Sequence, residues 1–108
     1  ERMQRQKVDV LAIRKAQAFE EVQTLVGKFL LVDSGIIKII LFGSLARDDV
    51  SSLNSDIDLA VSCSGEHFLM LVAHAQDSLF KVDLVELSTA DNRIKDAITR
   101  EGMVLYEQ

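Results

Sequence analysis

Two apolar runs separated by a polar loop constrain this chain more than any other feature of its sequence. The first run, residues 36–42, is rich in β-branched residues and ends abruptly at Gly43-Ser44. The second run, residues 57–62, directly follows Asp56 and contains Asp58. Side chains alternate between the two faces of a strand, so these aspartates share one face while the residue between them points into the core. The pattern predicts two buried strands, with two carboxylates where the second one begins.

Two carboxylates on one side of a strand repel each other, and neither is easily kept near an apolar core. A divalent cation would neutralise them. The small residues Gly43 and Ser44 leave room and backbone N–H groups for a phosphate. A metal ion and a phosphate together indicate nucleotide chemistry. Considered alone, Asp56 and Asp58 are also compatible with a solvated strand start, because most aspartates lie at protein surfaces.

The composition is that of a small globular protein. A length of 108 residues predicts a single domain over residues 1–108 with one modest core. The net charge of −5 argues against an extended nucleic-acid-binding surface, which would need a basic face. The apolar runs are too short to cross a membrane, and the polar start lacks the apolar segment of a signal peptide.

The rest of the chain is predicted to alternate between helices and strands. Apolar residues recur at three- and four-residue spacing over residues 8–30, which predicts a helix that ends at the turn cluster 33–35. A short helix capped by Ser44 is expected after the first strand, followed by a polar loop over residues 48–54. The other expected elements are a helix over residues 68–79, a strand over 81–87, a helix between Asp91 and Gly102, and a strand over 103–106. This order predicts the α/β (α+β) class, with helices packed on a small mixed sheet.

Asp83 is a third informative carboxylate, because it lies near the start of a strand that is apolar on both faces. The crossover over residues 65–80 is long enough for this strand to run parallel to the strand that begins after Asp56. If the two strands are neighbours, Asp83 converges with Asp56 and Asp58. Three carboxylates and a triphosphate supply the oxygen ligands that Mg²⁺ prefers, and such a set can hold two ions about 3.5–4 Å apart. The alternative is a plain ion pair between Asp83 and Lys81.

In combination, Gly43-Ser44, Asp56-x-Asp58 and Asp83 resemble the polymerase β-like nucleotidyltransferases. The short chain and its closing segments, residues 82–87 and 98–107, are similar to the minimal nucleotidyltransferases (MNT) of bacteria and archaea. The resemblance covers residues 36–107. The loop between Ser44 and Asp56 is one residue longer than the usual spacer of that family.

The resemblance implies a role for each motif. Gly43 and Ser44 would hold the β- and γ-phosphates of a nucleoside triphosphate, with Arg47 as a further candidate for phosphate contact. The three aspartates would ligate two Mg²⁺ ions, and Asp83 would also help to activate the acceptor hydroxyl. The implied reaction transfers a nucleotide, AMP if the triphosphate is ATP, to a hydroxyl and releases pyrophosphate.

The resemblance also implies a partner, because minimal members of the family act beside a HEPN-domain protein, in several cases as an antitoxin that adds AMP to a toxin. The alternatives are an antitoxin that neutralises its partner by occlusion and a small-molecule nucleotidyltransferase of the antibiotic-modifying kind. Three clustered carboxylates argue against neutralisation by occlusion alone. The antibiotic-modifying enzymes normally carry an additional helical domain, which is not expected in this sequence. A domain of this size is not expected to bury all its apolar residues, which predicts self-association or partner binding. In particular, we do not expect all of the following residues to lie in the core: Leu25, Phe29, Phe68, Leu71 and Leu79.

The remaining reactive side chains are expected to be structural. Cys63 has no second cysteine with which to form a disulfide, which is typical of the reducing cytoplasm, and is expected to be a small buried residue. His67 and His74 lie seven positions apart on a predicted helix without a partner cluster. They are expected to be surface residues and not ligands.

Overall fold

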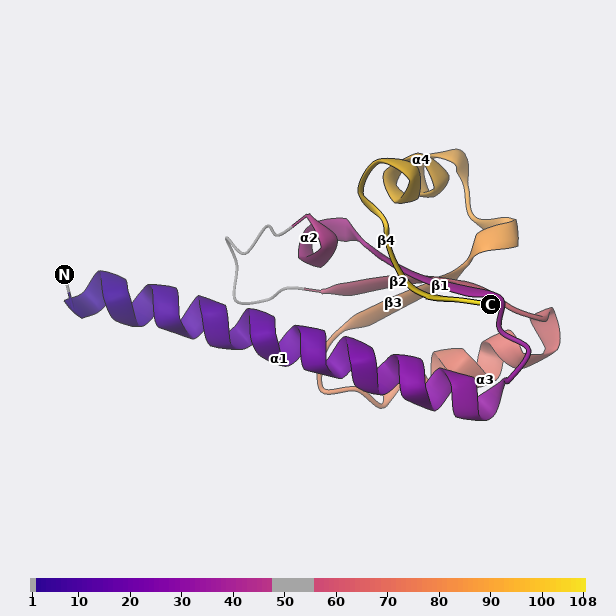
Figure 1. Ribbon diagram of the computed structural model, residues 1–108, viewed down its shortest axis with the longest axis horizontal. Helices are drawn as coiled ribbons and strands as arrows, with labels where there is room; N and C mark the ends of the chain where they lie inside the picture. Colours follow the sequence, from indigo (N-terminus) through magenta and orange to yellow (C-terminus); the bar gives the residue numbers. More distant parts are fainter. Residues whose placement is uncertain (1, 48–55) are drawn as a thin grey trace.

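A computed structural model describes residues 2–47 and 56–108 of the chain. The long helix α1 (Arg2–Val32) lies along a sheet and extends past it toward the N-terminus (Figure 1). The elements that follow are β1 (Lys38–Phe42), α2 (Gly43–Ala46), β2 (Ile57–Ser62), α3 (Gly65–Gln76), β3 (Val82–Glu86), a 3-10 turn η1 (Leu87–Thr89), α4 (Asn92–Glu101) and β4 (Met103–Glu107). The polar loop expected over residues 48–54 lies outside the described residues. Among the helices described, none is long and apolar enough to cross a membrane.

The four strands form one mixed sheet in the order β3-β2-β1-β4. The central strand β1 pairs antiparallel with both β2 and β4, whereas β2 and β3 are parallel. Helix α3 makes the crossover between the parallel strands, as the length of residues 65–80 predicted. The predicted fold class, a small mixed sheet flanked by helices, is therefore confirmed.

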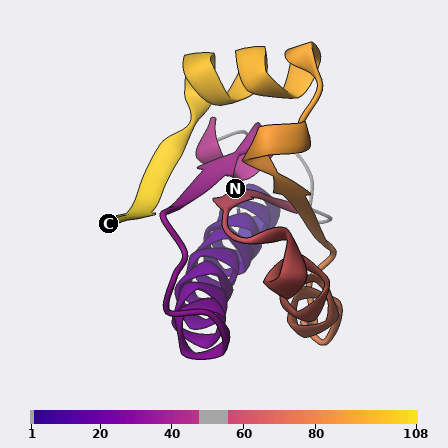
Figure 2. The same ribbon diagram turned by 90° about the vertical axis from the view of Figure 1, so that its right-hand side faces the viewer.

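Helices cover both faces of the sheet. Because side chains alternate along each strand, neighbouring residues of a strand pack against the helices on opposite faces. Figure 2 shows α4 on one side of the sheet, with α1 and α3 on the other. On the side of α1 and α3, Ile39, Leu41 and Leu59 are fully buried in the main core. On the side of α4, Ile40, Phe42 and Ala60 form a second, smaller core with the apolar side chains of that helix.

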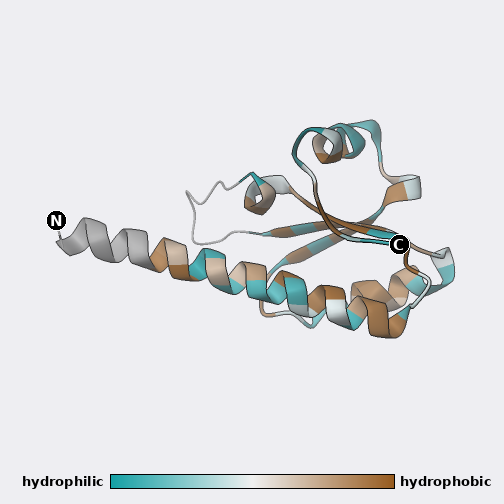
Figure 3. Cartoon of the chain, in the orientation of Figure 1, coloured by the Kyte–Doolittle hydropathy of each residue, from teal (hydrophilic) through white to brown (hydrophobic). Residues whose placement is uncertain are grey.

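The five apolar residues that were not all expected to lie in the core are divided between core and surface. Leu25, Phe29 and Leu71 are fully buried, whereas Phe68 is only partly buried against the same cluster. The reason for this burial is that α1 and α3 pack together on one face of the sheet and share one apolar layer. Leu79 is exposed, in agreement with that expectation. The other exposed large apolar side chains are those of Val10, Ile13, Leu31, Ile37, Leu69, Met70, Met103 and Val104. Figure 3 shows the ribbon of α3 coloured mainly as hydrophobic and that of α4 mainly as hydrophilic.

One predicted helix end differs from the structure, and another is confirmed. Phe42, and not Ser44, is the N-terminal capping residue of α2, and this end of the helix has no side-chain capping hydrogen bond. Gly102 ends α4 as predicted, through its N–H bond of 2.8 Å to the Ile98 carbonyl, but with a φ of −65°. A Cβ at position 102 would lie 2.9 Å from Cγ2 of Ile40 and would overlap the Ile98 carbonyl oxygen. Close packing of α4 against β1 therefore requires the glycine.

Candidate active site

Asp58 and Asp83 lie side by side on the two parallel strands. The register of β2 and β3 pairs them directly, and both side chains share the sheet face that α4 covers. The two carboxyl groups are close enough for a hydrogen bond to Asp83 to contribute to a raised pKa of Asp58. The convergence that the sequence predicted for these two residues is therefore present, and we call Asp58 and Asp83 the carboxylate pair.

The environment of the carboxylate pair favours a proton on Asp58. The pKa of the Asp58 carboxyl is raised from 3.8 to about 6, chiefly by burial and then by the negative charges of Asp83 and Asp56 and a hydrogen bond to Asp83, while Lys81 opposes the rise. Two carboxylates that share a site cannot both ionise easily. The pair is therefore a place where a positive charge would be strongly stabilised.

Asp56 does not complete a three-carboxylate cluster. Its Oδ2 lies 3.7 Å from Nζ of Lys81, whose side chain is 70% exposed, while that of Asp56 is 41% exposed. Among residues 2–47 and 56–108, no three His, Cys, Asp or Glu side chains come together closely enough to hold a metal ion. Within this part of the chain, Asp58 and Asp83 are neighbours, whereas Asp56 pairs with Lys81. The ion pair considered for Lys81 is real, but its partner is Asp56 and not Asp83.

The turn formed by residues 43–47, here called the glycine turn, begins beside the carboxylate pair. Phe42 pairs with Asp58 in the sheet, so Gly43 immediately follows the residue opposite that aspartate. Gly43 has a φ of +79°, and a Cβ at this position would overlap the Asp58 carboxylate. The N–H of Arg47 donates to the Gly43 carbonyl over 3.1 Å and closes the turn. The glycine is therefore required both by its backbone conformation and by its contact with Asp58.

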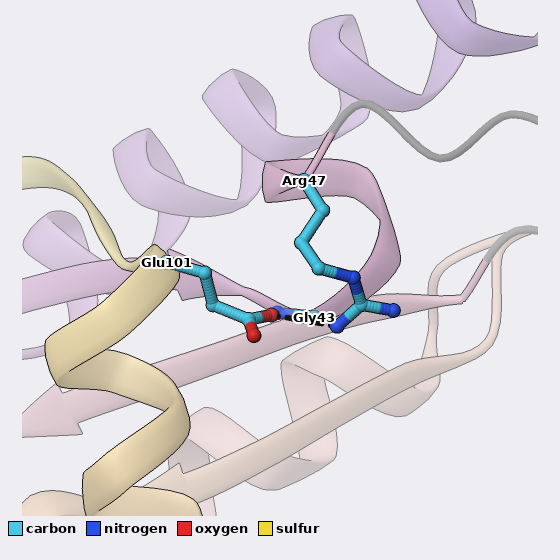
Figure 4. Close-up of polar contacts among 3 residues, drawn as sticks. All are labelled: Gly43, Arg47 and Glu101. Atoms are coloured by element: carbon cyan, nitrogen blue, oxygen red, sulfur yellow. Dashed lines mark hydrogen bonds and ion pairs between the residues drawn. The ribbon is translucent and has the colours of Figure 1, made fainter.

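Glu101 is a residue of this site that the sequence analysis did not single out. One of its oxygens, Oε2, accepts hydrogen bonds from the Gly43 N–H and from Nη1 of Arg47, each over 2.8 Å (Figure 4). The Glu101 side chain is 12% exposed, whereas that of Arg47 is 49% exposed. The sequence did contain an indication of this role. The helix dipole destabilises a negative charge at the C-terminal end of a helix, so an acidic residue there needs a cation to compensate it.

A cavity of about 550 Å³ opens at the carboxylate pair. Asp58 and Asp83 supply its acidic wall, and Phe42, Val85 and Ile94 are among its apolar lining residues. A concave site that combines apolar walls with a few polar groups is typical of a small-molecule pocket. Its volume and its acidic wall suit a ligand that brings its own cations, such as a metal-bound nucleotide.

The donor set at the carboxylate pair fits Mg²⁺. This ion is usually bound by one or two carboxylates together with phosphate oxygens of the substrate. Asp58 and Asp83 offer two adjacent carboxyl groups that repel each other when both are charged, which is the situation that a cation relieves. Asp56 lies two positions before Asp58 and is held only by an exposed ion pair.

The other titratable side chains of note lie around Asp33, at the end of α1. This buried carboxylate accepts a hydrogen bond from Gly35 through Oδ1, while Oδ2 has no hydrogen bond and lies 3.2 Å from Nδ1 of His67. The His67 side chain is 41% exposed, so it lies at the surface as expected, but its pairing with Asp33 was not predicted. Burial raises the pKa of the nearby Cys63 thiol, which is only partly buried and packs against the main core.

Comparison with known proteins agrees with this geometry. A model of the polymerase β nucleotidyltransferase family matches residues 26–108. Among the curated proteins, the search finds no match. Among solved structures, a toxin–antitoxin complex with AMP-PNP is 26% identical, with a TM-score of 0.62 over 79% of this chain and 73% of the other. A mutant MntA–HpeT toxin–antitoxin pair is 25% identical, with a TM-score of 0.60 over 77% and 71% of the two chains.

A third similar structure contains an MNT antitoxin with the tri-AMPylated HEPN toxin of Shewanella oneidensis. It is 20% identical, has a TM-score of 0.56, and covers 91% of this chain and 73% of the other. At that identity the likeness concerns the fold alone. The family match spans the sheet, the glycine turn and the carboxylate pair. The chain therefore belongs to the polymerase β nucleotidyltransferase family.

Proposed function

We propose that this chain is an Mg²⁺-dependent nucleotidyltransferase that transfers AMP from ATP to a hydroxyl of a HEPN-type toxin and so acts as its antitoxin. The observation that carries the proposal is the contact between the glycine turn and the carboxylate pair. It places the glycine turn beside the acidic oxygens that line a cavity of about 550 Å³, which is large enough for a nucleotide.

The reaction follows from this arrangement. An oxygen of the acceptor hydroxyl attacks the α-phosphorus of the triphosphate, the bond from that phosphorus to the bridging oxygen of the β-phosphate breaks, and pyrophosphate leaves. Asp83 takes up the hydroxyl proton. Gly43 and Ser44 hold the β- and γ-phosphates, with Arg47 beside them. Asp56, Asp58 and Asp83 would hold Mg²⁺, which stabilises the charge that develops on the phosphoryl oxygens.

A protein acceptor is supported by the comparisons and by the surface of the chain. Two similar structures, at 26% and 25% identity, come from toxin–antitoxin complexes, and one of them contains AMP-PNP. The third contains a HEPN toxin that carries AMP groups. This chain exposes large apolar side chains, among them Leu69 and Met70 of α3, and exposed apolar patches commonly mark association surfaces.

The direct test uses ATP labelled at the α- or the γ-phosphate. The purified chain is incubated with Mg²⁺, each form of ATP and a HEPN-type protein from the same organism, and the proteins are separated. Label is expected on the partner from α-labelled ATP only, with a mass increase of one AMP group for each modified hydroxyl. Chelation of Mg²⁺ and the substitution Asp83→Asn should both abolish labelling.

The alternatives give different results in the same assay. A stable complex that neutralises the toxin without labelling it indicates occlusion. Failure to bind the partner, together with labelling of small hydroxyl compounds, indicates a small-molecule enzyme. Label that arrives from γ-labelled ATP would contradict nucleotidyl transfer, because it would report a kinase.

A further inference from the structure

Glu101 lies where the helix that carries it does not stabilise a negative charge. It is the last residue of α4, at the negative end of the helix dipole, and its side chain is 12% exposed. A buried carboxylate needs hydrogen-bond donors or a cation to offset its desolvation. Glu101 obtains both from the glycine turn, which is more than fifty residues earlier in the chain.

A single oxygen of Glu101 connects the first and last residues of the glycine turn. Oε2 accepts from the Gly43 N–H and from Nη1 of Arg47, so the backbone at one end and the guanidinium at the other are fixed to one atom (Figure 4). On its other side, Gly43 is in contact with Asp58. The glycine is thus held between the end of α4 and the carboxylate pair.

The pairing fixes Arg47 without using all of its donors. A guanidinium has five N–H donors, so a bond through Nη1 leaves others for a second anion. The Arg47 side chain is about half exposed, whereas its partner is nearly covered. A cation held by a buried carboxylate loses less conformational entropy when a phosphate arrives than a free arginine would.

We propose that Glu101 is a positioning residue of the triphosphate site, which acts by orienting Arg47 and the Gly43 backbone toward the β- and γ-phosphates. This inference rests on the proposed function, because it assumes that a triphosphate binds at the glycine turn. It assigns a role in nucleotide binding to the closing segment that contains Glu101 and Gly102. The alternative hypothesis is that Glu101 competes with phosphate for the same hydrogen-bond donors.

The test measures the affinity for AMP-PNP in the presence of Mg²⁺, and the KM and kcat of AMP transfer, in wild type, Glu101→Gln and Glu101→Ala. Positioning predicts weaker AMP-PNP binding, about tenfold for the alanine variant and less for glutamine, which keeps an acceptor oxygen. KM for ATP should rise more than kcat falls. In an Arg47→Ala background, Glu101→Gln should have a much smaller effect, because the two residues act as a unit.

Glu107→Gln is the matched control, because Glu107 pairs with Lys38 over 3.2 Å on the neighbouring strand and lies outside the site. It should leave AMP-PNP affinity unchanged. Tighter binding by Glu101→Gln would show that Glu101 competes with phosphate and would overturn the inference. A lower melting temperature with unchanged affinity would also overturn it, since Glu101 would then only hold α4 in place.

Failure of the proposed function would be recognised separately. If wild type binds AMP-PNP but transfers no AMP, the proposed function fails, and the affinities of the variants still decide the role of Glu101. If wild type binds and transfers while both Glu101 variants match it, only this inference fails. If wild type binds no AMP-PNP, both are wrong.

Discussion

Gly43 lies against the Asp58 carboxylate so closely that no side chain could be placed between them. The contact arises from the sheet, because Phe42 pairs with Asp58 and Gly43 is the next residue along the chain. The glycine turn and the carboxylate pair are therefore fixed relative to each other by the strand register. Their relative position does not depend on the conformation of the loop that connects them in the sequence.

Replacing Gly43 by alanine should destabilise the protein and abolish nucleotide binding. The left-handed backbone conformation alone costs a residue with a Cβ about 1–2 kcal/mol, and the overlap with Asp58 adds to that. Urea unfolding and AMP-PNP titration measure the two effects. Gly27→Ala in α1 is the control, since a Cβ there meets nothing within 4 Å, and it should stabilise by about 0.5–1 kcal/mol. Equal stability of Gly43→Ala and wild type would refute the contact.

Asp58→Asn should abolish AMP transfer while leaving the fold intact or more stable without metal. The substitution removes one of two like charges that share a partly buried site, so repulsion with Asp83 is relieved. Thermal melts in a chelator and labelling assays with Mg²⁺ test the two halves. Full activity in Asp58→Asn would show that the metal role proposed for this residue is wrong.

The metal-free protein should become less stable as the pH rises from about 4 to above 6. The folded state holds the Asp58 proton more tightly than the unfolded state, with a pKa of about 6 against 3.8. The contribution of this bound proton to the stability of the folded state is therefore fully present below pH 3.8 and is lost as the pH rises through about 6. Melting curves at pH 4.5 and 7.5 should show this loss in wild type, and a much smaller one in Asp58→Asn. An identical pH dependence in the two proteins would refute the assignment.

Ser44→Ala should weaken triphosphate binding without affecting stability. Phe42 is the capping residue of α2, so the Ser44 hydroxyl does not cap the helix. Loss of one hydrogen bond to a charged phosphate costs about 1.5–3 kcal/mol of binding free energy. Titration of AMP-PNP and a thermal melt of the same sample separate binding from folding. A clear drop in melting temperature with unchanged affinity would leave Ser44 with a structural role only.

His67→Ala should destabilise the protein without affecting nucleotide binding. The Asp33 carboxylate is 6% exposed, and the only cation-forming group described near its Oδ2 is Nδ1 of His67, at 3.2 Å. Loss of that partner leaves a buried charged group poorly compensated, which costs about 1–3 kcal/mol. Chemical unfolding measures the loss, and His74→Ala on the same helix is the control. If both variants unfold alike, the pairing contributes nothing.

Much of the fold could be predicted from the sequence because it depends on local periodicity. The alternation around Asp58 identified β2 with its observed bounds, Ile57–Ser62. The length of the segment between β2 and β3 indicated a parallel pair, and that pairing brings Asp83 to the same face as Asp58. These properties follow from the geometry of a strand and the reach of a crossover, which neighbouring elements change little.

The tertiary structure decided which charged groups meet. The sequence grouped Asp56 with the other two aspartates, but in the folded chain it pairs with Lys81. Glu101 joins Gly43 across 58 positions, and no periodicity specifies such a distance. The Glu101 contact depends on how α4 packs against β1, where Gly102 allows a close approach. Strand alternation thus fixed the face on which the carboxylates lie, whereas long-range packing selected their partners, because electrostatic pairing depends on distances that only the assembled layers define.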